Sequence, residues 1–154
     1  MIQDILPHRY DVSYHPERTP ERRSFLLLVS REGVLFAERD GAFTLPRFSD
    51  FETEALSFTS LCQKSRYLFA IDRDYFFLLP PSALPAGKLG EGYRFLGPTE
   101  LRDLKPQHFA FAAVTATQLY RFYDQRKFCG RCGEKMTHAE EERAMCCKHC
   151  GLIE

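Results

Sequence analysis

Two Cys-x-x-Cys motifs near the C-terminus constrain this chain more than any other feature. Cys129 and Cys132 form the first motif, residues 133–146 follow, and Cys147 and Cys150 form the second. In each motif a tight turn brings two thiolates to the same side of the backbone. The two turns together present four soft sulfur ligands, which suit a tetrahedral Zn²⁺ ion. The segment between them has the length of a hairpin, so the sequence predicts one closed zinc site.

A fifth cysteine and two histidines offer alternatives to this ligand set. Cys146 is a poorer ligand than Cys147, because its use with Cys150 stretches the second motif to Cys-x-x-x-Cys. His138 and His149 could replace a sulfur, but four cysteines already satisfy a structural site. We therefore expect Cys146 to lie outside the site, and we expect the metal to hold the fold, because four thiolates leave no open position for water. A thiol redox function is the alternative for any Cys-x-x-Cys motif.

The composition changes near residue 126, which divides the chain into two predicted domains. Residues 127–154 carry few apolar side chains and cannot fold by hydrophobic burial alone, so a structural metal has to hold this small zinc ribbon together. Gly133 and Gly151 follow the two motifs, at turn positions that need a positive φ. Residues 1–126 hold most of the aromatic side chains and form the larger domain.

Short apolar runs predict the strands of the larger domain. We expect a hairpin across Arg31–Gly33, a second hairpin across Arg73–Asp74 and one further strand, with strands at residues 24–30, 33–38, 65–72, 75–80 and 91–97. The segment 80–92 is rich in Pro and Gly and is expected to be a loop.

Helical patterns follow the strands. Thr99 is a suitable N-cap for a short helix, and after Pro106 the chain runs without Gly or Pro from Gln107 to Arg126. Helical spacing in this segment predicts one long helix with a single apolar face, made of Phe109, Ala112, Ala116, Leu119, Tyr120 and Tyr123. Strands followed by a long helix indicate an α+β fold.

The larger domain shows no catalytic residue. His8, His15 and His108 have no partner nearby in the sequence, so we expect them to be surface or packing residues. Asp72 and Asp74 could be read as a carboxylate pair, but aspartates favour turns, and a solvated hairpin turn is expected here. Cys62 is expected to be a small buried hydrophobe.

Charge and aromatic residues argue against nucleic-acid binding. The chain has 21 basic and 21 acidic side chains, so no overall positive field attracts nucleic acid or anionic lipid. Residues 121–154 are similarly balanced, whereas a phosphate-binding surface needs clustered positive charge. The aromatic residues of the strands could stack on bases, but they lack interleaved basic residues. Core packing or a subunit interface is therefore expected for Tyr67, Phe69, Tyr75, Phe76 and Phe77.

Location follows from features that the sequence lacks. It contains no apolar stretch long enough to span a membrane, and its N-terminus does not resemble a signal peptide. We therefore expect a cytoplasmic protein. In that reducing compartment, clustered cysteines bind metal more often than they form disulfides.

The segment FYDQRKFCGRCGEKM, followed by ERAMCCKHCG, resembles the zinc ribbon of the bacterial NADH pyrophosphatases, which belong to the Nudix hydrolase superfamily. The likeness runs from Tyr120 to Gly151 and rests on an aromatic helix that leads into Phe-Cys-x-x-Cys-Gly, a spacer, and Ala-Met-x-Cys-x-x-Cys. It implies one structural zinc per chain. It also implies that residues 1–126 are a Nudix-like domain, that the protein is a homodimer, and that the zinc ligands are Cys129, Cys132, Cys147 and Cys150.

The same resemblance implies an activity for the parent enzyme: hydrolysis of the pyrophosphate of NAD(H) to NMN(H) and AMP, and removal of NAD caps from RNA. In that family, Mg²⁺ or Mn²⁺ is held by glutamates of a Nudix box, Gly-x5-Glu-x7-Arg-Glu-U-x-Glu-Glu-x-Gly-U, where U is aliphatic. The motif is absent here, and Glu140–Arg143 is the nearest acidic run. Because the family's catalytic domain follows the ribbon, we expect this chain to be an inactive fragment with structural or dimerisation roles.

A different class of function stays open, namely a stand-alone zinc-ribbon module that binds nucleic acid or a protein partner. The reading frame after Glu154 discriminates the two: codons that continue into a Nudix box favour the pyrophosphatase fragment, and a stop codon favours the module. The redox alternative predicts that the purified protein contains no zinc, so metal analysis tests it directly.

Overall fold

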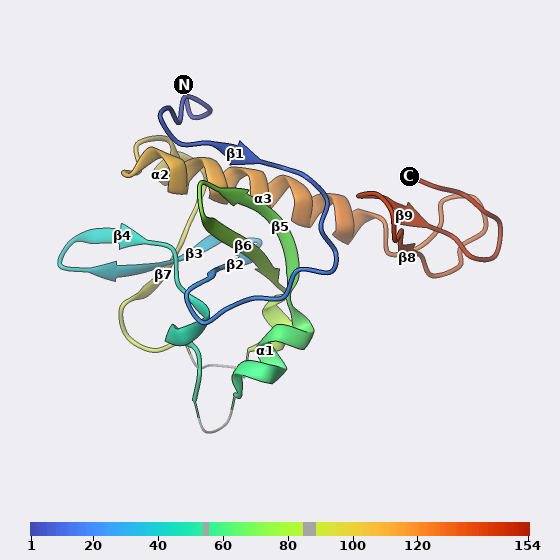
Figure 1. Ribbon diagram of the computed structural model, residues 1–154, viewed down its shortest axis with the longest axis horizontal. Helices are drawn as coiled ribbons and strands as arrows, with labels where there is room; N and C mark the ends of the chain where they lie inside the picture. The colour runs from blue at the N-terminus through green and yellow to red at the C-terminus, as the bar shows by residue number, and fades with distance from the viewer. Residues whose placement is uncertain (54–55, 85–88) are drawn as a thin grey trace. The chain divides into compact units, whose positions relative to one another are not determined.

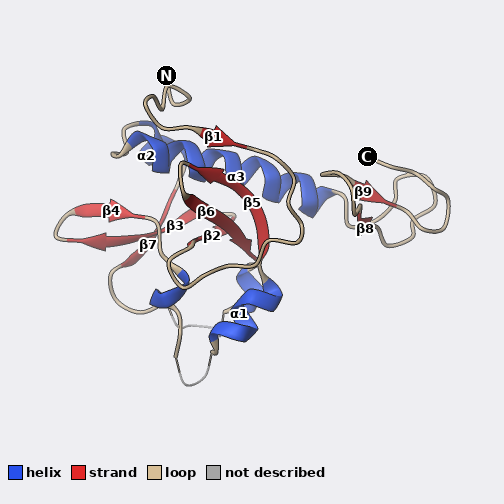
Figure 2. Cartoon of the chain, viewed as in Figure 1, coloured by secondary structure: helices blue, strands red, loops and turns tan. Residues whose placement is uncertain are grey.

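In the computed structural model, which describes residues 1–53, 56–84 and 89–154, strands come first and a long helix follows (Figure 1). The chain divides into two compact units, Met1–Thr117 and Gln118–Glu154, and the division falls within that helix. Strands and helices are both well represented, as Figure 2 shows by colour. The predicted α+β fold class is confirmed.

The first unit is built around a seven-stranded sheet. Its strands follow the order β1-β5-β6-β2-β3-β4, and β7 also pairs with β3. The pairing of β2 with β6 is parallel, and the other pairings are antiparallel. The strands are β1 (Tyr10–Asp11), β2 (Phe25–Ser30), β3 (Gly33–Arg39), β4 (Ala42–Thr44), β5 (Arg66–Ile71), β6 (Asp74–Leu79) and β7 (Tyr93–Leu96). The helices that begin in this unit are α1 (Phe58–Lys64), α2 (Pro98–Arg102) and α3 (Gln107–Gln125).

The central strands β2 and β6 are buried on both faces of the sheet, which explains why their sequences are continuously apolar rather than alternating. On one face, Phe77 lies in a core cluster with Leu61 of α1. Phe76, the next residue, points to the opposite face. There its ring stacks on Phe25 at 5.0 Å, and Phe25 meets Phe109 of α3 at 5.2 Å.

A bulge in β5 sends its two aromatic side chains to different faces. The register between β5 and β6 shifts so that Tyr67 pairs with Phe77 and Phe69 pairs with Phe76. In a regular strand, residues two positions apart would share a face, and the extra residue breaks that alternation. The predicted packing role is confirmed for these four aromatic residues, which are buried, whereas Tyr75 is half-buried.

Both predicted hairpins are present. Gly33, the first residue of β3, directly follows the turn from β2 and has a φ of +136°. A Cβ added there would lie 2.1 Å from the carbonyl oxygen of Leu96, so this position requires glycine for both its backbone angle and its lack of side chain. The turn between β5 and β6 contains Asp72, whose φ of +55° is a conformation that Asp tolerates better than most residues.

Helix α2 begins earlier than the sequence predicted. Its N-cap is Gly97 rather than Thr99, and Pro98 is the first helical residue. The carboxylate of Glu100 accepts a hydrogen bond from the Gly97 N–H at 3.0 Å. Proline at the first helical position favours this start, because its missing N–H has no partner there in any helix.

Helix α3 ends at Gln125, within one residue of the predicted end, but its buried face differs from the prediction. The buried residues are all small: Ala110, Ala112, Ala113 and Ala116. The larger members of the predicted face are only half-buried: Phe109, Leu119, Tyr120 and Tyr123. Small side chains let a helix approach its neighbours closely, and larger ones at the margin keep part of their surface exposed. Within the described part of the chain, no helix is both long and apolar enough to cross a membrane.

Among the described residues, α1, β1, β4 and a 3-10 helix at Phe48–Asp50 were missed from the sequence. The two strands are two and three residues long, too short to show an alternating pattern. Helix α1 does carry a local signal, because the Ser57 hydroxyl accepts a hydrogen bond from the Ser60 N–H at 3.2 Å as an N-cap. The predicted loop at residues 80–92 contains a 3-10 turn at Pro81–Ala83, and residues 85–88 of it lie outside the described residues.

Candidate metal centre

Two turns of the second unit follow the same backbone pattern and carry the four predicted ligands. The N–H of Gly133 donates to the carbonyl of Cys129 at 2.8 Å, and the N–H of Gly151 donates to that of Cys147 at 2.9 Å. Each of these cysteines also donates its own N–H to a carbonyl further along, at 2.7 and 2.8 Å. The two glycines have φ values of +79° and +73°, the positive angles that the sequence predicted.

A short hairpin brings the two turns together. Strands β8 (Thr137–His138) and β9 (Met145–Cys146) pair in antiparallel fashion, and the Ala139 N–H donates to the Ala144 carbonyl at 2.9 Å. The acidic residues 140–142 occupy the exposed end of this hairpin. Its inner side forms a small cluster with the two turns, made of the buried residues Cys129, Met136, Met145 and Cys147.

The four sulfur atoms converge. The Sγ atoms of Cys129, Cys132, Cys147 and Cys150 all lie within 4.8 Å of one another. The shortest separations cross from one motif to the other, at 3.5 Å for Cys129–Cys150 and 3.4 Å for Cys132–Cys147. Zn–S bonds of about 2.3 Å in a tetrahedron place the sulfurs about 3.8 Å apart, so the observed spacing fits a tetrahedral zinc ion.

The electrostatics of the cluster also favour a cation. Burial disfavours the Cys129 thiolate, but hydrogen bonds from the backbone N–H groups of Cys132 and Arg131 prevail and lower the pKa of Cys129 to about 7. At Cys132 the backbone N–H of Glu134 favours the thiolate, but burial and the neighbouring sulfurs raise its pKa to about 12. Four thiolates at this spacing repel one another, and a divalent cation allows all of them to ionise together.

Cys146 and the two nearby histidines lie outside the four-sulfur group. Cys146 is on β9, where its Sγ lies 3.4 Å from Oγ1 of Thr137. The ring of His138 packs edge-to-face on Tyr123 at 5.0 Å, and His149 is exposed. Among the described residues, no other group of three or more His, Cys, Asp or Glu side chains converges in this way.

Comparison with known families agrees with this geometry. Residues 124–154 match the NADH pyrophosphatase zinc ribbon domain. This segment is therefore similar to the zinc ribbon of the NADH pyrophosphatases. The match does not extend to residues 1–123, and no curated protein matches the chain. The similarity to a zinc ribbon therefore rests on the segment that carries the four cysteines and their turns.

Sequence reasoning missed one cluster of titratable side chains in the first unit. Nδ1 of His8 lies 2.7 Å from Oδ2 of Asp72, and the ring of His8 lies 4.1 Å from that of His108. These histidines, expected to be surface or packing residues, are half-buried and contact side chains that lie far away in the sequence. Because the three residues are far apart in the sequence, no local motif could have indicated the cluster. His15 has a nearer partner, Glu17, whose carboxylate lies 3.0 Å from its Nδ1.

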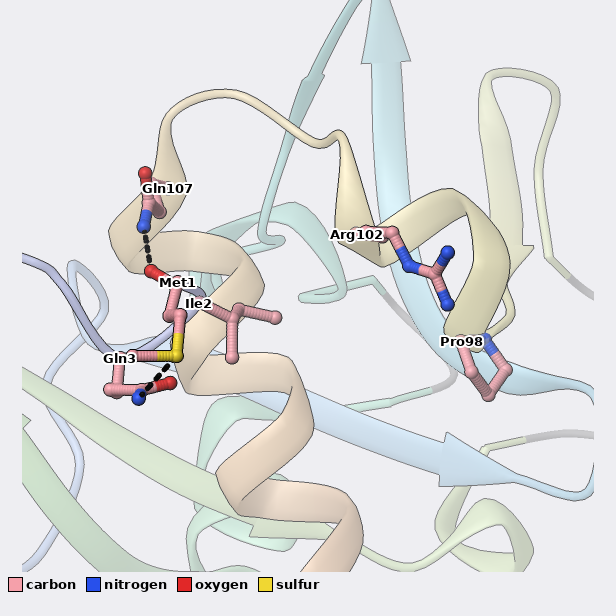
Figure 3. Close-up of a pocket in the computed structure, with 6 residues that line it drawn as sticks. All are labelled: Met1, Ile2, Gln3, Pro98, Arg102 and Gln107. Carbon is pink, nitrogen blue, oxygen red and sulfur yellow. Dashed lines mark hydrogen bonds between the residues drawn. The ribbon is translucent and has the colours of Figure 1, made fainter.

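Cys62 and a hollow beside the first residues of the chain are two further features of the first unit. In neither do the described side chains bring an acid and a base together. Cys62 is half-buried rather than buried, its Sγ lies 4.0 Å from the Pro20 carbonyl, and burial raises its pKa. A hollow of about 510 Å³ is lined by Met1, Ile2, Gln3, Pro98, Arg102 and Gln107 (Figure 3). The guanidinium of Arg102 lies beside Pro98, and the other side chains on its wall are apolar or amides.

Proposed function

We propose that this chain is the N-terminal and zinc-ribbon portion of an NADH pyrophosphatase, an enzyme that hydrolyses NAD(H) to NMN(H) and AMP. The observation that carries the proposal is that four converging thiols coincide with the family match over residues 124–154. The absence of a Nudix box from the sequence supports a structural rather than catalytic role for these residues. Residues 1–126 then serve as a Nudix-like domain.

The four cysteines hold zinc as a structural ion. With four thiolate ligands, zinc has no coordination position left for water or substrate. What the ion supplies is a cross-link between the turn at Cys129 and Cys132 and the turn at Cys147 and Cys150. The protein supplies the backbone N–H groups that stabilise the thiolates and the glycines that close the turns.

The partner that we propose is a second copy of this chain, because the resemblance to the family implies a homodimer. NAD(H), or an NAD-capped RNA, is then the substrate of the complete enzyme, with Mg²⁺ or Mn²⁺ bound by a Nudix box outside this sequence. A cytoplasmic location suits the free thiols, which a reducing compartment preserves. Sedimentation of the purified chain over a range of concentrations tests the dimer, and a monomer at every concentration would contradict it.

An activity assay tests the assignment of roles. The purified, zinc-loaded chain is incubated with NADH and Mg²⁺ or Mn²⁺, and release of AMP is followed by chromatography. We expect no turnover above a metal-free control, because the glutamates that hold the catalytic metal are absent from the sequence. Turnover by this chain alone would show that catalytic residues lie within it.

The coding sequence after Glu154 tests the proposal itself. We expect the reading frame to continue into a Nudix box. A protein extended through that box should then hydrolyse NADH under the conditions in which the shorter chain is inactive. A stop codon directly after Glu154 would instead favour the binding module that the sequence left as the alternative.

A further inference from the structure

The N-terminal arm, defined as residues 1–11, is attached to the first unit by a short strand and an aromatic side chain. Strand β1 pairs with β5, with Tyr10 opposite Ile71. The ring of Tyr10 lies 5.5 Å from that of Phe69 in β5 and 4.9 Å from that of Phe111 in α3. Figure 1 shows the arm running alongside α3. Two residues of strand pairing are a weak attachment, so other contacts have to contribute.

Asp72, in the turn between β5 and β6, is the polar anchor of the arm. Its N–H donates to the Arg9 carbonyl at 2.8 Å, and its Oδ1 accepts from the Arg9 N–H at 2.8 Å. Its Oδ2 lies 2.7 Å from Nδ1 of His8. The Arg9 N–H, and next the His8 side chain, lower the pKa of Asp72. The carboxylate form of Asp72 is therefore the one that holds the arm.

His108 completes this cluster from the first turn of α3. Its ring lies 4.1 Å from that of His8 and 4.5 Å from that of Phe109. Burial, and next the charge of His8, lower the pKa of His108, and the carboxylates of Asp72 and Asp74 oppose this effect only in part. The arrangement therefore favours the uncharged form of His108. Its ring lies next to that of His8, which is hydrogen-bonded to the Asp72 carboxylate.

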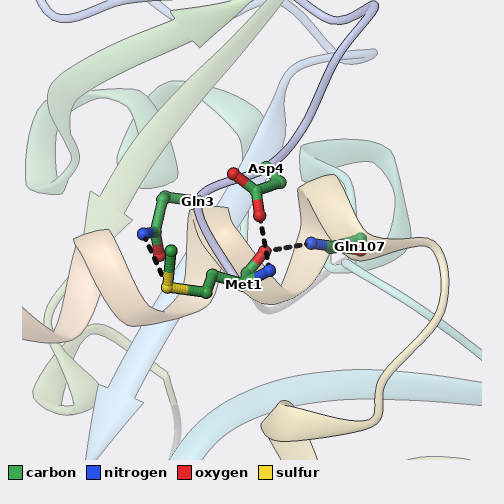
Figure 4. Close-up of polar contacts among 4 residues, drawn as sticks. All are labelled: Met1, Gln3, Asp4 and Gln107. Atoms are coloured by element: carbon green, nitrogen blue, oxygen red, sulfur yellow. Dashed lines mark hydrogen bonds and ion pairs between the residues drawn. The ribbon is translucent and has the colours of Figure 1, made fainter.

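The contacts that Gln107 and Ile5 make with the arm contain no group that titrates near neutral pH. The side-chain amide of Gln107 donates to the Met1 carbonyl, as Figure 4 shows, and Ile5 is buried. Gln107 and His108 are consecutive residues, so the start of α3 contacts the arm at two points. Only the second contact, between His108 and His8, contains groups that change charge between pH 5 and 8.

We propose that His8, Asp72 and His108 form a pH-sensitive clasp for the N-terminal arm, closed while His108 is uncharged and loosened when His108 is protonated against the ring of His8. Asp72 lies beside His8, so a positive charge on that ring faces a carboxylate. Among the described residues, a proton on His108 has no such partner at hydrogen-bond distance and meets the positive charge of His8 on a partly buried surface, where their repulsion is poorly screened. Asp74 offsets part of this repulsion, while the flanking residues Arg9 and Arg73 add positive charge to the same segments.

The direction of the pH effect follows from the lowered pKa of His108. When the arm is free, this histidine titrates near its ordinary pKa of 6.5. The clasp therefore contributes its full stability above pH 6.5 and loses it as the pH falls from there toward the lowered pKa. Asp72 acts in the same direction in more acidic solution, since its pKa is lowered from 3.8 and its contribution is lost only as the pH falls through that lowered value.

Nuclear magnetic resonance of the whole, zinc-loaded chain tests the clasp. The heteronuclear ¹H–¹⁵N NOE of residues 5–11 reports the order of the arm, and NOE cross-peaks between the two imidazole rings report the contact itself. Between about pH 7.5 and about pH 5.5, we expect the arm amides to lose their high NOE values and the ring cross-peaks to disappear. An arm that stays equally ordered across this range would overturn the proposal.

Matched variants separate the clasp from general acid effects. His108→Phe keeps an aromatic ring that cannot be charged, so its arm should stay ordered at the acid end of the range. His15→Gln removes a histidine that contacts Glu17 and Tyr67 instead, so it should respond like the unaltered protein. If His108→Phe loosens as much as the unaltered protein, the proposal fails.

A direct titration keeps the test decisive should His108→Phe not fold. In the unaltered protein the imidazole C–H signals of His108 should titrate with a midpoint below 6.5, together with the change in the arm amides. A midpoint at or above 6.5, or one unrelated to the change in the arm, would also overturn the proposal.

Discussion

Cys146 and Cys147 are neighbours in sequence but have different surroundings. Successive side chains of a strand point to opposite sides, and Cys146 belongs to β9 while Cys147 follows it directly. Cys147 is buried with its sulfur in the four-thiol group, whereas Cys146 is half-buried beside Thr137. At the scale of the residue, this alternation separates a proposed metal ligand from a second cysteine that lies outside the four-sulfur group.

The two cysteines supply a matched pair of variants. Structural zinc sites have apparent binding free energies of about 10–16 kcal/mol, so one of four ligands contributes about 3 kcal/mol, or about a hundredfold in affinity. Cys147→Ser should therefore weaken zinc binding by about that factor, while Cys146→Ser should leave it unchanged. Competition with a chromogenic chelator measures both affinities. Equal losses in the two variants would contradict the assignment of ligands.

Gly33 illustrates a residue whose role comes from its lack of a side chain. Gly33→Ala would place a Cβ 2.1 Å from the Leu96 carbonyl oxygen at a positive φ, so the turn or β7 has to shift. We expect a loss of at least about 2 kcal/mol in the free energy of unfolding. Gly90→Ala is the control, because a Cβ there has open space around it, and it should change stability by less than about 0.5 kcal/mol. Urea titration of both variants measures the difference.

At the scale of the element, short helices depend on their ends. Helix α1 spans only Phe58–Lys64, and a helix of this length is unstable in isolation. The Ser57 hydroxyl accepts a hydrogen bond from the Ser60 N–H, and Leu61 lies in the core cluster that also contains Phe77 of β6. The cap and a single buried side chain therefore position the helix against the sheet.

Removal of that cap has a predictable cost. Ser57→Ala should lower the free energy of unfolding by about 1 kcal/mol, because the Ser60 N–H loses its acceptor. Ser57→Asp should restore the stability, since its carboxylate can accept the same hydrogen bond. Ser60→Ala keeps the backbone N–H and serves as the control, with little expected change. Thermal or urea unfolding distinguishes these variants, and a stable Ser57→Ala protein would show that the cap is dispensable.

At the scale of the whole molecule, each of the two units is stabilised by a different kind of interaction. The first unit has a sheet whose central strands are buried on both faces by aromatic and aliphatic side chains. The second has a cluster of four buried residues, two of which are proposed metal ligands. Burial on this smaller scale cannot offset the conformational entropy of folding without a further cross-link.

Zinc removal should therefore unfold one unit and spare the other. After treatment with a strong chelator, amide signals of the ribbon, residues 127–154, should collapse toward random-coil positions. Signals from β2, β5 and β6 should keep their dispersion, because the core of the first unit needs no metal. Readdition of zinc should restore the ribbon. Loss of dispersion in both units, or in neither, would contradict this division of stability.

Much of the larger unit could be predicted from local pattern. The continuous apolar runs of β2 and β6 indicated buried strands, and Gly33 indicated the turn between β2 and β3. The start of α2 was missed because Gly97 and Thr99 are both plausible caps in sequence, and Pro98 decides between them. The buried face of α3 was only partly predicted, since helical spacing does not tell whether alanines or aromatic residues face the core.

The sequence by itself determined the zinc ribbon, because its ligands, glycine turns and hairpin all depend on contacts between residues close together in the chain. Only the tertiary structure decided which strands neighbour each other, how the β5 bulge divides the aromatic residues, and that His8 and His108 meet at Asp72. These features join segments that are distant in the chain. Their geometry depends on the packing of the whole sheet, and no local pattern of residues encodes it.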